Sequence, residues 1–212
     1  MNAPLIGEQE WIDFAIDGRA VKARPGWTIL ETARENHIHI PTLCYHPAVK
    51  PWGGCRLCVV EAKYGRRGKV MVSCLNPPIP ELEVFTHSER VKNVRRWVLE
   101  MLLASCPASP DIRKLAAEYG VTATRFPIRD PEEKCIRCGL CVAVCTEVVG
   151  VQALTFGSRG VTKQLDTPYR VPNNDCVACG CCATICPTGA MLDRIDQVRG
   201  DISRRTGHGY AH

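Results

Sequence analysis

Apolar and polar residues alternate at the start of the chain in a way that predicts two strands and a turn. In "WIDFAIDG", residues 11–18, apolar side chains recur at every second position, and the segment ends in Asp17-Gly18, a pair typical of tight hairpins. "RAVKARPG", residues 19–26, is expected to return as the second strand. The period then changes to that of a helix in "TILETARENH", residues 28–37, where Thr28 and Glu31 form a capping box.

Three further short strands are predicted after a loop that begins near Pro41. They are "CVVEAK" (58–63), "KVMVSC" (69–74) and "LEVFT" (82–86). Several strands and one helix within ninety residues predict a β-grasp, a small mixed sheet with a helix across it. We assign residues 1–87 to this domain.

The middle of the chain has the pattern of a short helical connector. Thr86 to Glu89 reads as a second capping box, apolar residues follow at helical spacing, and Pro107 ends the helix. Ser109-Pro110 is expected to start another helix. We therefore assign residues 88–130 to a helical connector and linker, 131–196 to a cysteine-rich module and 197–212 to a tail. The predicted fold class is α+β.

The cysteine-rich module contains the same spacing twice, C-x2-C-x2-C-x3-C, in "CIRCGLCVAVC" and "CVACGCCATIC". Three thiolates in a tight loop can hold one face of a [4Fe-4S] cube, and Gly139 and Gly180 let the backbone come close. In two-cluster ferredoxins of the bacterial type the fourth Cys ligates the other cluster. One cubane is therefore expected to bind Cys135, Cys138, Cys141 and Cys186. The other is expected to bind Cys176, Cys179, Cys182 and Cys145.

Four cysteines in the N-terminal domain have a different spacing, C-x10-C-x2-C-x15-C. Plant-type two-iron ferredoxins use C-x4-C-x2-C and a distant fourth Cys. The first interval is longer here, but a loop with Gly53-Gly54 can still wrap the cluster while a remote strand supplies the last thiolate. The predicted ligands of this [2Fe-2S] cluster are Cys44, Cys55, Cys58 and Cys74.

Other uses of the cysteines fit the pattern less well. No secretory signal and no stretch of roughly 20 apolar residues is seen, which predicts a cytoplasmic protein without membrane insertion, whose thiols stay reduced. Structural zinc uses two separated pairs and not four cysteines in one run. Cys106 and Cys181 are left over: Cys106 is expected to be a buried apolar side chain, and Cys181 could substitute for Cys182, although the register favours Cys182. No histidine is predicted as a ligand.

The formal net charge of +5 does not include the charge of any bound cluster. Three oxidised clusters with their thiolates carry roughly −2 each, which leaves the loaded protein nearly neutral. The basic residues are scattered, so we expect no nucleic-acid partner. Neither G-x-G-x-x-G nor G-x-x-x-x-G-K-[ST] occurs, and no nucleophile–base pair is evident, so we expect no dinucleotide loop and no active site.

Four segments carry a family resemblance that spans roughly residues 10 to 196. They are "ARPGWTILETARENHIHIPTLCYHP", "GGCRLCVVEA", "CIRCGLCVAVCTEVVGVQALTF" and "CVACGCCATICPTGAM". The sequence resembles the N-terminal part of the large iron–sulfur subunit of respiratory complex I. It is also similar to the diaphorase iron–sulfur subunits of NAD-linked hydrogenases, and to N-terminal domains of iron-only hydrogenases and NAD-dependent formate dehydrogenases.

Two departures from that family change the expectation. The relatives carry an additional cubane with one His and three Cys between the two modules, whereas residues 98–120 contain Cys106 and no His-x3-Cys, so we expect that cluster to be missing. Pro187 follows Cys186 as in the usual pattern, but Thr146 follows Cys145 where a Pro is expected. This difference concerns local backbone geometry and not ligation.

The resemblance implies an iron–sulfur electron-transfer subunit of a cytoplasmic multisubunit oxidoreductase. Its partners would be an NAD(P)H-binding flavoprotein and a second catalytic redox subunit, such as a hydrogenase or formate dehydrogenase, and its cofactors one [2Fe-2S] and two [4Fe-4S] clusters. The alternative is a freely diffusing polyferredoxin, which strong net acidity would favour. A redox-sensing regulator would need a recognition helix or basic patch, and the sequence shows neither.

Overall fold

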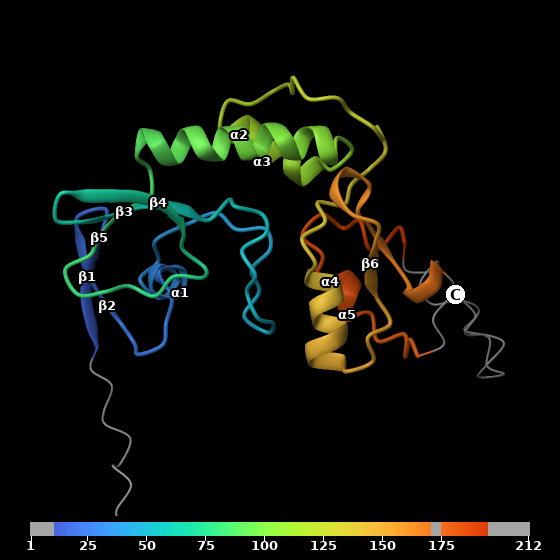
Figure 1. Cartoon of the computed structure of the whole chain (residues 1–212), viewed down its shortest axis with the longest axis horizontal. Helices are drawn as coiled ribbons and strands as arrows, with labels where there is room; N and C mark the ends of the chain where they lie inside the picture. The colour runs from blue at the N-terminus through green and yellow to red at the C-terminus, as the bar shows by residue number, and fades with distance from the viewer. Residues whose placement is uncertain (1–10, 171–174, 195–212) are drawn as a thin grey trace, which may run out of the picture. The chain divides into compact units, whose positions relative to one another are not determined.

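A five-stranded mixed sheet forms the centre of the N-terminal half of the protein (Figure 1). The computed structural model describes residues 11–170 and 175–194. They divide into a first unit, 11–43 with 51–99, and a second unit, 44–50 with the described residues from 100 onward. The strand order in the first unit is β2-β1-β5-β3-β4. The strands are β1 (Ile12–Ile16), β2 (Arg19–Ala23), β3 (Val59–Tyr64), β4 (Arg67–Val72) and β5 (Glu83–Phe85).

The pairing of β1 makes the sheet mixed, because β1 runs antiparallel to β2 and parallel to β5. The turn between β1 and β2 has positive φ at both Asp17 (49°) and Gly18 (78°), the pattern of a two-residue hairpin turn. Ile16 and Ala23 are fully buried, so the alternation seen in the sequence separates the core face from the solvent face. The five predicted strands are confirmed.

Helix α1 (Ile29–Glu35) begins with the predicted capping box. The Thr28 hydroxyl accepts the Glu31 N–H at 3.2 Å, and the Glu31 carboxylate accepts the Thr28 N–H at 2.7 Å. Ile29, Leu30 and Ala33 are fully buried on one face of this helix. The helix is therefore fixed both by its first turn and by its apolar side.

The two connector helices are α2 (Glu89–Ser105) and α3 (Pro110–Glu118). Ser109 caps α3 as expected, with its hydroxyl accepting the Ile112 N–H at 3.3 Å. The predicted capping box at Thr86 is wrong in its first residue. Thr86 instead donates its N–H to the Asp17 carboxylate at 2.8 Å, and Ser88 accepts the N–H of the first turn of α2.

The second unit contains the cysteine-rich module. Two short helices, α4 (Leu140–Ala143) and α5 (Cys181–Thr184), lie beside each other (Figure 1). A π-helix, Val144–Val149, continues α4 without a break. A small hairpin of β6 (Thr155–Gly157) and β7 (Gln164–Asp166), with a 3-10 turn at Gly160–Thr162 between the strands, was not expected from the sequence. After β7, Tyr169 in the segment Pro168–Arg170 has a positive φ of 61°. The core here is small and is formed by Cys141, Cys145, Ala153, Leu154 and Met191.

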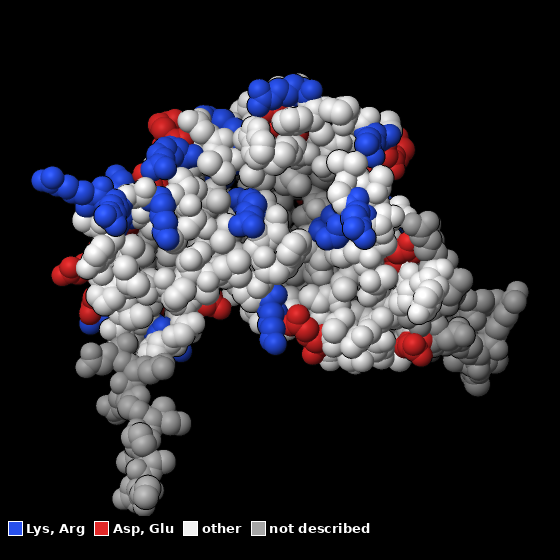
Figure 2. Space-filling view, viewed as in Figure 1, with Lys and Arg blue, Asp and Glu red and all other residues white. Residues whose placement is uncertain are grey.

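On the visible face in Figure 2, Lys and Arg side chains are scattered among acidic and uncharged residues. In the described part of the chain, no helix combines the length and apolar character needed to cross a bilayer. The predicted tail, 197–212, and residues 1–10 of the predicted first domain lie outside the described residues.

Candidate metal centre

The two cysteine-rich loops have nearly the same backbone. Each has a non-glycine residue at positive φ, Arg137 at 56° and Ala178 at 57°, followed two residues later by a left-handed glycine that starts a helix. A side chain at positive φ costs about 1–2 kcal/mol, so two such positions at matching sites indicate a loop that serves a purpose other than stability. Gly139 (81°) and Gly180 (74°) avoid that cost.

One cavity in the second unit, which we call cavity A, is lined by thiols of both runs. Its cysteines come from the first loop and from the end of the second run. The lining includes Ile136, Gly139, Phe156, Leu165, Thr188, Ala190, Met191 and Arg194. The four thiols are those of Cys135, Cys138, Cys141 and Cys186. This grouping matches the set expected from the sequence, while ligation of a cluster stays a prediction.

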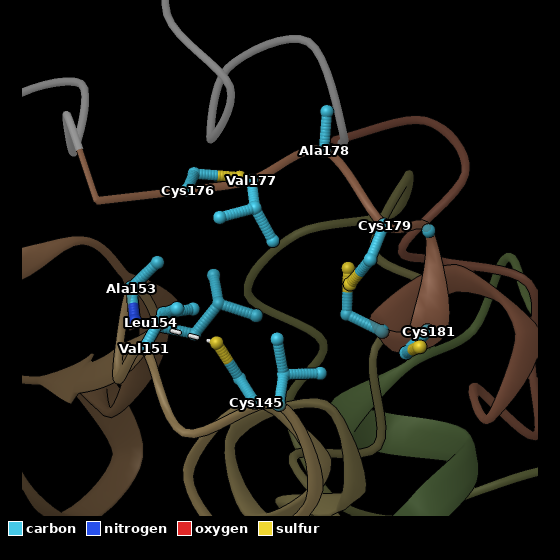
Figure 3. Close-up of a pocket in the computed structure, with 12 residues that line it drawn as sticks. Cys145, Val151, Ala153, Leu154, Cys176, Val177, Ala178, Cys179 and Cys181 are labelled. Carbon is cyan, nitrogen blue, oxygen red and sulfur yellow. Dashed lines mark hydrogen bonds between the residues drawn. The ribbon is translucent and has the colours of Figure 1, made fainter.

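A second cavity, cavity B, has the complementary composition. Figure 3 shows Cys145 facing the loop that carries Cys176 and Cys179, with Val151 and Leu154 at one side. Its cysteines are Cys145, Cys176, Cys179, Cys181 and Cys182. Its other lining residues are Val, Ala, Leu and Gly, so none of the described residues around cavity B is charged. As in cavity A, three of the expected cysteines come from one run and one from the other. Cavity B contains Cys181 in addition.

Backbone amides donate hydrogen bonds to sulfur in both cavities. The Arg137 N–H donates to Cys135 Sγ at 3.3 Å, and the Ala153 N–H donates to Cys145 Sγ at the same distance (dashed in Figure 3). Cys186 Sγ and Thr188 Oγ1 lie 3.8 Å apart. Donors aimed at sulfur stabilise thiolates and are one of the means by which proteins tune iron–sulfur clusters. The residues present therefore fit an iron–sulfur group.

Burial keeps several of these thiols protonated in the metal-free protein. It raises the pKa of Cys135 and Cys182 above the usual value and that of Cys141 further still. Apolar surroundings that disfavour a free thiolate are typical of structural cysteines and not of exposed catalytic ones. A bound metal core would supply the positive charge that removes these protons.

A buried carboxylate fixes the entrance to the first loop. Glu133, whose side chain is 9% exposed, accepts the N–H groups of Lys134 at 3.0 Å and Cys135 at 2.8 Å. The Arg194 guanidinium donates to the same carboxylate at 2.7 Å, and Arg137 lies 3.8 Å from its other oxygen. The sequence did not indicate Glu133 or Arg194, because Glu133 lies outside the cysteine run and its partner Arg194 follows 61 residues later in the chain.

In the first unit, Cys55, Cys58 and Cys74 lie close together. A hydrogen bond with the Cys74 thiol lowers the pKa of Cys58 to about 6, although burial and the neighbouring Cys55 oppose this. Ser73 holds the carbonyl of Cys58 through its hydroxyl at 2.8 Å and its N–H at 3.1 Å. The segment after β4 is thus tied to the loop before β3, and three of the four predicted [2Fe-2S] ligands are positioned together.

The glycines of this loop allow close packing. A Cβ on Gly53, at φ 69°, would lie 2.6 Å from the Leu75 side chain, and a Cβ on Gly54 would lie 2.2 Å from the Trp52 ring. Arg56, between two of the cysteines, is also at positive φ (58°). This loop therefore shares one backbone feature with the cysteine-rich loops of the second unit, a non-glycine residue at positive φ between two cysteines.

Cys44, the fourth predicted ligand of the two-iron cluster, is buried at 2% exposure. It begins the segment 44–50 that groups with the second unit, where the Lys50 N–H donates to the Glu147 carboxylate at 2.8 Å. Its ligation, like that of the other predicted cysteines, remains a prediction.

Arg95 supports the first site from helix α2. It is fully buried, and its guanidinium donates to the Leu57 carbonyl at 3.1 Å and the Val59 carbonyl at 2.8 Å. These carbonyls flank Cys58 on both sides. The sequence offered one signal for this role, a basic residue between the apolar positions Val94 and Val98 of the helix.

The two left-over cysteines differ in their surroundings. Cys106 is fully buried, donates its thiol to the Leu102 carbonyl at 3.0 Å, and has its pKa raised to about 12 by burial. Cys181 lines cavity B, and a hydrogen bond with Cys179 raises its pKa. Within the described residues, no three His, Cys, Asp or Glu side chains converge on a single-ion metal site.

Two family models match the chain. A 2Fe-2S iron-sulfur cluster binding domain matches residues 9–89, and a 4Fe-4S dicluster domain matches residues 134–190. The chain therefore contains both kinds of iron–sulfur domain, in this order.

Two curated proteins are similar to the chain over most of its length. The NADH-ubiquinone oxidoreductase 75 kDa subunit of Reclinomonas americana is 31% identical over 179 residues, which is 74% of this chain and 26% of that protein. The NADPH-Fe(3+) oxidoreductase subunit alpha of Geobacter sulfurreducens is 32% identical over 213 residues, or 89% and 25%. The chain thus spans about a quarter of the length of these curated relatives.

A solved structure matches over nearly its whole length. A chain in the crystal structure of an NAD+-reducing [NiFe]-hydrogenase in the H2-reduced state superposes with a TM-score of 0.71 and 34% identity, covering 84% of this chain and 86% of that one. Together with the two domain matches, this similarity shows that the chain belongs to the family of iron–sulfur proteins that includes the complex I 75 kDa subunit and this chain of the NAD+-reducing hydrogenase.

Proposed function

We propose that this chain is an electron-transfer subunit of a cytoplasmic multisubunit oxidoreductase. It relays single electrons between an NAD(P)H-linked flavoprotein and a second catalytic subunit, a hydrogenase, formate dehydrogenase or similar enzyme. The proposed domains are the [2Fe-2S] β-grasp at 1–87, the connector at 88–130 and the double-cubane module at 131–196. The proposed ligands are the twelve cysteines named from the sequence.

The observation that carries this proposal is that each cysteine run supplies thiols to both cavities A and B. Cys141 lines cavity A and Cys145 lines cavity B, four residues apart on one continuous helical segment. At about 1.5 Å of rise per residue, this separates them by roughly 6 Å along the axis. In the second run, Cys182 lines cavity B and Cys186 lines cavity A. Two clusters held this way would be neighbours able to exchange electrons.

The residues of the chain would hold and orient the clusters, and the clusters would supply the one-electron chemistry. The twelve thiolates would bind iron. Arg95 and Ser73 fix the backbone around Cys58, and Glu133 fixes the backbone at Cys135. The names of the relatives support NAD(P)-linked partners, since they describe subunits of NADH- and NADPH-linked oxidoreductases and an NAD+-reducing hydrogenase.

The proposal is tested by reducing the purified, cluster-loaded chain with and without its partner. NADH or NADPH alone should leave the visible absorption of the clusters unchanged. The flavoprotein that co-purifies with the chain from its native source should cause rapid bleaching under the same conditions. A Cys55→Ala variant is the matched control, because it should lose the two-iron cluster and slow this reduction while retaining the cubanes. Rapid NADH oxidation by the flavin-free chain would contradict the proposal.

A further inference from the structure

The two cavities differ in charge although their cysteine spacing is the same. Arg194 lines cavity A, and its partner Glu133 stands directly before the first loop. None of the described residues lining cavity B is charged. The repeat therefore duplicates the ligands but not their electrostatic surroundings.

Arg194 is held in place beside cavity A. Its guanidinium lies 2.7 Å from Glu133 Oε1, and the side chains are 27% and 9% exposed. The same oxygen of Glu133 accepts the Cys135 N–H at 2.8 Å, so the ion pair is attached to the loop that carries the first predicted ligand. Arg137, whose Nε donates to the Lys163 carbonyl at 2.6 Å, adds a second cation on the far side of the carboxylate. Of these charged groups only Arg194 lines cavity A, while the carboxylates of Glu133 and Asp130 act on it and Lys134 pairs with Asp193.

Reduction adds one negative charge to a cluster, and a nearby cation stabilises the product of that step. Net charge, hydrogen bonds to sulfur and exposure are the factors that set iron–sulfur potentials. Resting on the function proposed above, we propose that Arg194, positioned by Glu133, raises the reduction potential of the [4Fe-4S] cluster in cavity A. An electron within the double-cubane module would then reside in cavity A before cavity B.

The size of the effect is limited by partial exposure and by the charge of Glu133. We expect Arg194→Gln to weaken reduction of the cavity A cluster roughly tenfold, which for a one-electron couple is a shift of about 59 mV to lower potential. Glu133→Gln should shift the potential in the opposite direction, because it removes a negative charge while its amide oxygen still accepts the Cys135 N–H. Damage to the loop would not give opposite signs.

The experiment is a potentiometric titration of the full cluster-loaded chain, followed by electron paramagnetic resonance. The cavity A signal is identified as the one lost in Cys135→Ala. Arg194→Lys, which keeps the charge, should retain the wild-type potential. Lys134→Gln is the matched control: it removes one charge next to Glu133, but Lys134 pairs with Asp193 at 2.8 Å and does not line the cavity, so a smaller shift is expected.

Opposite shifts in Arg194→Gln and Glu133→Gln, confined to the cavity A signal, would support the inference. Unchanged potentials, or equal shifts of both cubane signals, would overturn it while leaving the relay function intact. If Arg194→Gln lost its cluster, the sign in Glu133→Gln would decide, with a rise supporting the inference and no rise overturning it. A wild-type chain without [4Fe-4S] signals would overturn both the inference and the proposed function.

Discussion

Cavities A and B begin from the same cysteine spacing and end in different surroundings. In the first run the helix continues past Cys145 as a π-helix to Val149, whereas in the second run α5 ends at Thr184 and Cys186 is followed by Pro187. Cavity A has four thiols and a cation, and cavity B has five thiols and no charged residue among its described lining. The comparison teaches that the spacing determines the loop, while residues remote in sequence determine its electrostatics.

The largest effect is expected from the fourth cysteine of each run. Cys145→Ala should remove the cluster of cavity B, and Cys186→Ala the cluster of cavity A, because each thiol lines the cavity of the other run. Spectroscopy of the two cubanes in each variant, with iron analysis, checks this. If Cys145→Ala lost the cluster of cavity A instead, and Cys186→Ala that of cavity B, the crossed arrangement would be contradicted.

A proline at position 146 should damage cavity B selectively. Thr146 lies inside the π-helix, where a proline would remove a backbone donor and clash with the preceding turn, at a cost of about 3 kcal/mol or more. Thr146→Pro should therefore lower the free energy of unfolding and loosen the cluster bound by Cys145. Pro187→Thr is the matched control at the equivalent position beyond α5, and denaturant unfolding should show a much smaller change. Equal changes in the free energy of unfolding of the two variants would contradict this prediction.

The fifth thiol of cavity B should make its third ligand replaceable. In Cys182→Ala, the neighbouring Cys181 can take up the iron, so part of the cluster should remain. Cys141→Ala should lose the cluster of cavity A completely, since Leu140 stands at the equivalent position. Iron and sulfide content of the two variants measures the difference. Adding Cys181→Ala to Cys182→Ala should remove the remaining cluster. If the double variant retained as much iron and sulfide as Cys182→Ala alone, substitution by Cys181 would be contradicted.

The smallest effect is expected outside both cavities. Cys106→Ala should keep all three clusters and lower the free energy of unfolding by about 1–2 kcal/mol, through the lost packing and the hydrogen bond to Leu102. Absorption spectra and urea unfolding provide the test. Loss of a whole cluster would show that Cys106 is a ligand.

Local patterns predicted most of the fold, because alternation, capping residues and turn pairs act over a few residues. Asp17-Gly18 and the Thr28–Glu31 capping box are examples. The capping box predicted at Thr86 is wrong because Thr86 forms hydrogen bonds with Asp17, 69 residues away in the sequence. The β6–β7 hairpin is three residues per strand, too short for a periodic signal.

The candidate site shows the same division between local and remote information. The spacing of the cysteines grouped the thiols of cavities A and B correctly in space, whereas their ligation is still a prediction. Arg95, Glu133 and Arg194 were not found, because their roles depend on backbone groups and charges that only the fold brings together. These residues act on the ligands through hydrogen bonds and not through a motif.

Iron and acid-labile sulfide in the anaerobically purified chain test the central claim most directly. One two-iron and two four-iron clusters predict about ten iron and about ten sulfide per chain. About two of each, or stoichiometric zinc with little sulfide, would contradict the assignment of cavities A and B to cubanes.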